Sequence, residues 1–136
     1  MSADPRTKRE LNSPEAIADL VDAFYAEVVA DSVLGPIFKD IDLQQHKPIV
    51  RAYWRKMLLR NRESYRRNMI ARHISLHARH PLQHRHFQRW LALFVETVDE
   101  RFSGNSAIRA KRLASTIATH LEALLKRVRH KGEEHE

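Results

Sequence analysis

Residues 86–104 read HFQRWLALFVETVDERFSG, and the spacing of their apolar side chains decides the fold class. These apolar residues recur at steps of three and four positions: Phe87, Trp90, Leu91, Phe94, Val95, Val98 and Phe102. Such spacing is typical of an α-helix that buries one wide face. Gly104 and Asn105 then end the pattern. We therefore predict a long helix that packs against a core.

Helical periodicity also extends over the rest of the chain. The sequence SPE at residues 13–15 is a helix start, because serine caps, proline suits the first turn and glutamate favours the positive helix end. We predict breaks at residues 34–36, at residues 61–63 and at Pro81. The chain has only three glycines and shows no strand-like alternation. The sequence thus predicts an all-α fold.

Length and composition indicate one ordinary globular domain. A chain of 136 residues fits one domain, and 43% apolar with 30% charged residues argues against a disordered chain. We place the domain at residues 13–130, between flexible segments at residues 1–12 and 131–136. The absence of cysteine excludes disulfides and thiolate metal sites. No apolar run could span a membrane and no secretory signal is visible, so we expect a cytoplasmic protein.

The formal net charge of +7 raises the question of an anionic partner. Much of the excess falls in the arginine-rich residues 51–72. A nucleic-acid-binding module would need such a patch, but no helix-turn-helix, zinc-finger or RNA-binding motif accompanies it. A solvated basic face is the simpler interpretation. A nucleic-acid-binding or regulatory module is kept as an alternative.

Nine histidines is a high number, and five lie close together: His73, His77, His80, His84 and His86. His73 and His77 stand one helical turn apart on the apolar side of their segment. For the other three we predict solvated imidazoles at a polar helix end. A zinc site would need three or four ligands, and no suitable cluster accompanies the pair. A non-haem metal-binding bundle stays open, but a single imidazole facing an apolar cavity is what haem iron takes.

Several short motifs follow one another between residues 14 and 125. They are LVDAFY (20–25), LGPIF (34–38), His46, YW (53–54), MLL (57–59), Tyr65, Asn68, HFQRWLALF (86–94) and TVDERFSG (97–104). In order and spacing, this set resembles group III of the truncated globin family. The scarcity of glycine agrees, since that group lacks the paired-glycine motifs of the other groups. The resemblance implies a two-over-two helical sandwich around a haem b.

The resemblance also assigns roles to residues on the ligand side of that haem. Tyr25 matches the distal tyrosine, whose hydroxyl can donate to iron-bound oxygen. Trp90 matches the distal tryptophan, whose indole N–H can only donate. His46 would be a gate or second donor, Val50 would line the ligand space, and Phe38 would pack on the porphyrin.

Pro48 is a departure from the family pattern. Proline is tolerated in the first turn of a helix and disruptive inside it. We therefore expect the second long helix, capped by Asp40 or Asp42, to start or bend near His46.

The iron ligand on the opposite, proximal side has two candidates. Counting forward from Tyr65 and Asn68, the proximal histidine of the family falls on His73. Counting back from Trp90 favours His77, which stands thirteen residues before it, close to the interval usual in the family. The short connection through Pro81 allows little change in the spacing between the iron ligand and Trp90. We therefore choose His77, with His73 as the alternative.

The function implied by the resemblance is reversible binding of oxygen, or of nitric oxide or carbon monoxide, at haem iron. Oxygen or nitric oxide chemistry, peroxide reduction and sensing all fit, including dioxygenase-like or peroxidase-like activity. Bulk oxygen transport fits less well, because two strong donors should slow oxygen release. We expect a reductase as a partner.

Overall fold

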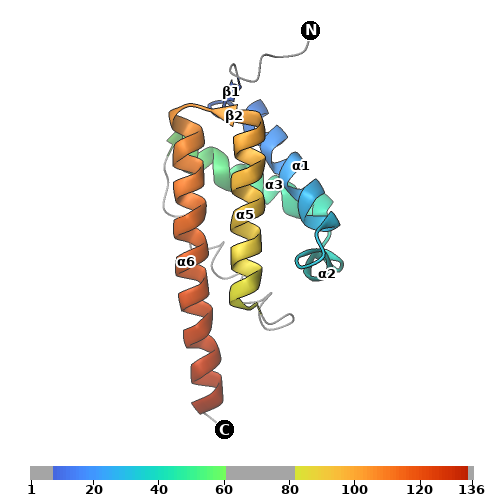
Figure 1. The fold of residues 1–136 in the computed structure, drawn as a ribbon, viewed down its shortest axis with the longest axis vertical. Helices are drawn as coiled ribbons and strands as arrows, with labels where there is room; N and C mark the ends of the chain where they lie inside the picture. Colours follow the sequence, from blue (N-terminus) through green and yellow to red (C-terminus); the bar gives the residue numbers. More distant parts are fainter. Residues whose placement is uncertain (1–7, 61–81, 135–136) are drawn as a thin grey trace.

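The computed structural model describes residues 8–60 and 82–134 (Figure 1). The helices are α1 (Pro14–Ala30), α2 (Gly35–Phe38), α3 (Leu43–Arg55), the π-helix η1 (Lys56–Arg60), α5 (His84–Arg101) and α6 (Asn105–Glu134). Two short strands, β1 (Arg9–Glu10) and β2 (Phe102–Ser103), pair in parallel. The predicted all-α fold is confirmed. The predicted break at residues 61–63 and the histidines at 73, 77 and 80 lie outside the described residues.

Two pairs of helices form the layers of the fold. In Figure 1, α5 and α6 run antiparallel and side by side, while α3 crosses behind α5 and α1 lies obliquely beside it. Helix α1 contacts both α3 and α5, so it joins the two pairs. This is the two-over-two arrangement that the sequence resemblance implied.

Local chemistry sets where α1 and α3 begin. The Ser13 hydroxyl accepts the Ala16 N–H at 3.1 Å, which confirms the predicted start of α1. The Asp42 carboxylate caps α3 by accepting the Gln44 N–H at 3.0 Å. Asp42, one of the two predicted caps, is therefore confirmed, and α3 begins at Leu43, three residues before His46, near which we expected the helix to start or bend. Pro48 thus lies inside the helix, where a proline costs more than one cap supplies, so the packing of α3 against α1 contributes to holding it there.

The core is formed mainly by the inward faces of α1, α5 and α6. Its largest fully buried side chains include Phe94 on α5, Ile17 and Leu20 on α1, and Leu125 on α6. Leu11 is also 0% exposed, although it falls in the segment expected to be flexible. The β1–β2 pair holds this segment against the turn between α5 and α6. Gly104 in that turn has a φ of +93°, a region that favours glycine.

At the other end of the chain, α6 continues to Glu134, into the tail expected to be flexible. None of the helices within residues 8–60 and 82–134 combines the length and apolar character that crossing a membrane requires.

Candidate functional site

Tyr25 and His46 meet between α1 and α3. Tyr25 is 5% exposed and lies on the face of α1 that also buries Val21 and Val28, which stand four residues before and three after it. Its hydroxyl oxygen lies 2.9 Å from Nε2 of His46, in a hydrogen bond. The fold thus brings together two predicted site residues that are 21 positions apart in the sequence.

Apolar side chains surround this polar pair. The Phe38 ring centroid lies 5.7 Å from that of Tyr25 and 6.2 Å from that of His46, with the rings edge to face in both contacts. Val50, one helical turn after His46, is partly buried against the core. An apolar surround strengthens a hydrogen bond because water competes less for its partners.

Trp90 on α5 is connected to Tyr25 by the ring of Phe24, which contacts both side chains. Phe24 contacts Trp90 edge to face at 5.8 Å between centroids and Tyr25 at 5.2 Å. Trp90 is partly buried, and its indole N–H makes no hydrogen bond within the described residues. Trp90 therefore lies one aromatic ring away from Tyr25.

Burial fixes the protonation state of Tyr25. It raises the pKa of the phenol well above its usual value of 10.0, because the charged phenolate would lose its hydration. Tyr25 consequently keeps its proton over the whole physiological range and can act as a neutral donor.

An ion pair that sequence reasoning missed links the end of α1 to α5. Nε of Arg89 donates to Oδ1 of Asp31 at 2.6 Å, and Oδ2 accepts the N–H groups of Val33 and Leu34 at 3.0 Å each. Burial by itself would raise the pKa of Asp31, whose side chain is 5% exposed, but these hydrogen bonds lower it overall. Arg89 directly precedes Trp90, so the pair links the helices that carry Tyr25 and Trp90.

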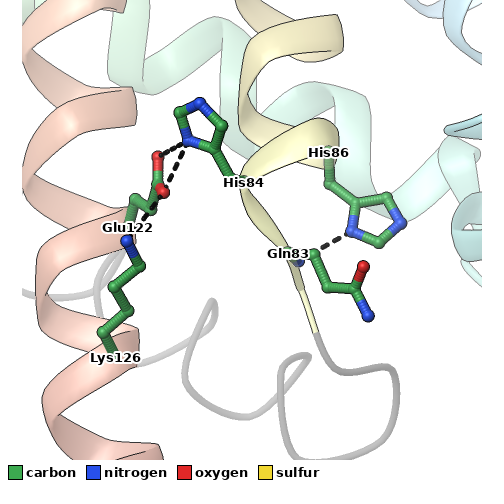
Figure 2. Close-up of polar contacts among 5 residues, drawn as sticks. All are labelled: Gln83, His84, His86, Glu122 and Lys126. Carbon is green, nitrogen blue, oxygen red and sulfur yellow. Dashed lines mark hydrogen bonds and ion pairs between the residues drawn. The ribbon is translucent and has the colours of Figure 1, made fainter.

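The two histidines at the start of α5 behave differently (Figure 2). His84 is exposed, as expected, and its Nδ1 lies 2.7 Å from a Glu122 carboxylate oxygen on α6. Lys126 approaches the same carboxylate at 3.3 Å. These contacts tie the start of α5 to α6.

The expectation of a solvated side chain is wrong for His86. His86 is 9% exposed, and its Nδ1 accepts the Gln83 N–H at 2.8 Å. It takes the place of the glutamine or glutamate of a capping box, three residues after the cap. The Q-x-x-H spacing is the signal that could have revealed this role. Burial, and to a smaller extent the charge of Arg85, lower the pKa of His86.

Two observations concern the non-haem metal site and the nucleic-acid-binding module that the sequence left as alternatives. Within residues 8–60 and 82–134, no group of three or more His, Asp or Glu side chains is placed to hold a metal ion. Arg51 and Lys47 pair with Asp22, at 2.7 and 3.5 Å. Most of the arginine-rich segment, like His73 and His77, lies outside the described residues.

A family model described as bacterial-like globin matches residues 10–129, which is most of the chain. The chain belongs to the bacterial-like globins. The group 3 truncated hemoglobin ctb of Campylobacter jejuni is 30% identical over 124 residues, covering 87% of this chain and 94% of that protein. The crystal structure of a group III truncated hemoglobin from Campylobacter jejuni has a TM-score of 0.72 at 27% identity, covering 88% of this chain and 95% of that one. The predicted group III membership is thus confirmed.

Membership of the globin family implies haem binding, and the described residues of this globin suit that group. A haem pocket needs apolar walls with few, well-placed polar groups on the ligand side. The site offers a buried hydroxyl on Tyr25, an imidazole on His46 and an indole N–H on Trp90, among aromatic neighbours. All three groups can donate to a ligand that carries partial negative charge.

Proposed function

We propose that this globin binds haem b and reversibly takes up oxygen, nitric oxide or carbon monoxide at the iron. The observation that carries the proposal is the Tyr25–His46 hydrogen bond, which is partly buried beside the ring of Phe38. Tyr25, His46 and Trp90 would contact the ligand, while Phe38 and Val50 would line the haem and the ligand space. When bound, the haem supplies the iron at which the gas attaches.

On the opposite side, His77 is our choice for the iron ligand and His73 the alternative. The protein would contribute one neutral imidazole there, as globins do. This choice rests on the spacing to Trp90 and is open to direct test.

The contact between Tyr25 and His46 determines what Tyr25 can offer a ligand. A tyrosine hydroxyl has one proton to donate and can also accept. If His46 carries its proton on Nδ1, Tyr25 donates to Nε2 and its proton is engaged. If His46 carries its proton on Nε2, the imidazole donates to the Tyr25 oxygen, and the hydroxyl proton is free for the ligand. The tautomer of His46 would thereby set the strength of ligand binding.

Two hydrogen-bond donors that contact one bound gas molecule slow its release from the iron. Bound oxygen gains negative charge, so hydrogen bonds from Tyr25 and Trp90 would stabilise it. We therefore propose oxygen or nitric oxide chemistry, or sensing, in preference to bulk transport. His46 is the general-base candidate if the chemistry includes peroxide. We expect a separate reductase and a cytoplasmic location.

Haem uptake tests this proposal directly. Titration of the purified protein with hemin should produce an intense Soret band at one haem per chain. His77→Ala should remove or shift that band, whereas the matched variant His73→Ala should leave it nearly unchanged.

The possible outcomes separate the parts of the proposal. A protein that stays colourless with hemin would overturn it, and salt-dependent DNA binding by that colourless protein would favour the nucleic-acid alternative. If His73→Ala instead removes or shifts the Soret band and His77→Ala leaves it nearly unchanged, the protein still binds haem and His73 is the iron ligand.

A further inference from the structure

Three aromatic rings form a continuous stack from the candidate site into the core. Trp90 stacks on Phe94 with centroids 5.7 Å apart and ring planes 14° apart. Phe94 stacks on Trp54 of α3 at 5.0 Å and 19°. Phe94 is 1% exposed and Trp54 is 4% exposed, so the inner end of the stack is buried.

This stack differs from the other ring contacts of the described residues, which are edge to face. Edge-to-face packing satisfies the ring quadrupoles but overlaps the π-orbitals poorly. Nearly parallel, offset rings orient their π-orbitals for better overlap than edge-to-face rings do, which favours electron transfer between them. The two ends of the stack are tryptophans, which with tyrosine are the most easily oxidised aromatic side chains.

We propose that Trp54 is a one-electron donor to the haem, acting through Phe94 and Trp90 when hydrogen peroxide is the oxidant. The proposal rests on the proposed haem binding and adds a redox role for a residue outside the ligand site. Trp90 lies at the candidate site, and Phe94 lies between the two indoles. The electron passes from Trp54 toward the haem, so the radical forms on Trp54.

The step consumes one hydrogen peroxide and draws one electron from Trp54. Reduction of one hydrogen peroxide to two waters breaks the O–O bond and consumes two electrons and two protons from solvent. When bound, the haem would supply both electrons, and Trp54 would return one of them. On losing this electron, Trp54 keeps its indole proton and becomes a cation radical. Two one-electron donations from an added reductant such as ascorbate complete the balance: one supplies the second electron to the haem, and the other reduces the Trp54 radical back to tryptophan.

The test uses the haem-loaded ferric protein, whose haem uptake and ferrous carbon monoxide complex are recorded first. It is mixed with one equivalent of hydrogen peroxide, frozen, and measured by electron paramagnetic resonance. Because the chain has two tryptophans, Trp54→Phe and Trp90→Phe each leave one. We expect a tryptophan radical in the wild type and its loss in Trp54→Phe, which keeps a ring in the stack. Trp54→Tyr should restore a radical with a tyrosyl spectrum.

A matched pair of variants tests the route. Phe94→Leu breaks the stack, whereas Phe24→Leu removes a ring that touches Trp90 and Phe94 only edge to face. Peptide mass spectrometry should find much less oxidised Trp54 in Phe94→Leu than in Phe24→Leu. Equal oxidation of Trp54 in both variants would overturn the relay. A wild-type protein with normal haem and carbon monoxide spectra but no Trp54 radical would overturn it too, and would leave haem binding intact. Failure of haem uptake itself would instead overturn the proposed function.

Discussion

At the scale of single residues, Tyr25 combines a buried ring with a hydroxyl that keeps its proton. Loss of that hydroxyl should weaken the hold on bound oxygen. We expect Tyr25→Phe to speed oxygen dissociation about tenfold or more, because a hydrogen bond to a charged partner contributes about 1.5–3 kcal/mol. Stopped-flow mixing of the oxygenated protein with carbon monoxide measures the rate. Tyr53→Phe, at a buried tyrosine beside Trp54, is the control. Equal oxygen dissociation rates in the two variants would show that the Tyr25 hydroxyl does not donate to the ligand.

His86 makes stability depend on pH. Because burial lowers its pKa from the usual 6.5, the unfolded chain binds the proton first as the pH falls. The stabilising contribution is therefore complete above about pH 6.5 and is lost as the pH falls toward the lower pKa of the folded state. Protonation also removes the Nδ1 acceptor for the Gln83 N–H.

We expect His86→Gln to reduce the loss of stability between about pH 7 and about pH 5, since glutamine caps without titrating. Urea unfolding at both pH values measures the difference. His120→Gln, at an exposed histidine of α6, is the control. An undiminished pH dependence in His86→Gln would contradict the assignment.

At the scale of elements, the Asp31–Arg89 pair joins the end of α1 to α5. We expect Asp31→Ala to lower the free energy of unfolding by about 2 kcal/mol, because it removes a charge-assisted hydrogen bond and the acceptor of two backbone N–H groups. Part of the Arg89 side chain stays in water, which limits the loss. Denaturant unfolding measures it.

Asp19→Ala is the matched control, since it breaks an exposed ion pair with Arg9. It should cost about 0.5 kcal/mol or less. Equal losses in the two variants would show that Asp31 acts as an ordinary surface charge.

At the scale of the whole molecule, the N-terminal segment closes the end of the fold where α5 turns into α6. Leu11 is fully buried, and the Ser103 hydroxyl donates to the Lys8 carbonyl at 3.0 Å. We expect Leu11→Ala to lower the free energy of unfolding by about 2–4 kcal/mol, the usual cost of a cavity left by a buried leucine. Val29→Ala, at a valine that is 47% exposed, should change it by about 0.5 kcal/mol or less. A loss at Leu11 no larger than at Val29 would mean that the segment does not stabilise the fold.

The sequence allowed much of the fold to be predicted, because the signals concerned are local. Apolar spacing in residues 86–104 marked α5, and the serine and proline at residues 13–14 marked the start of α1. Resemblance to a family singled out Tyr25, His46 and Phe38, which the structure brings into contact. Periodicity could not show that Trp90, Phe94 and Trp54 stack, because ring orientation depends on how α5 and α3 cross.

The sequence by itself thus determined the helical class, the α1 cap and the family, since capping and periodicity act within one or two turns. Only the tertiary structure decided that His86 is a buried cap while His84, two residues earlier, is exposed beside Glu122. It also decided that Asp31 pairs with Arg89, 58 positions away, and that Leu11 belongs to the core. Burial and ion pairing depend on which distant elements pack together, and no local pattern carries that information.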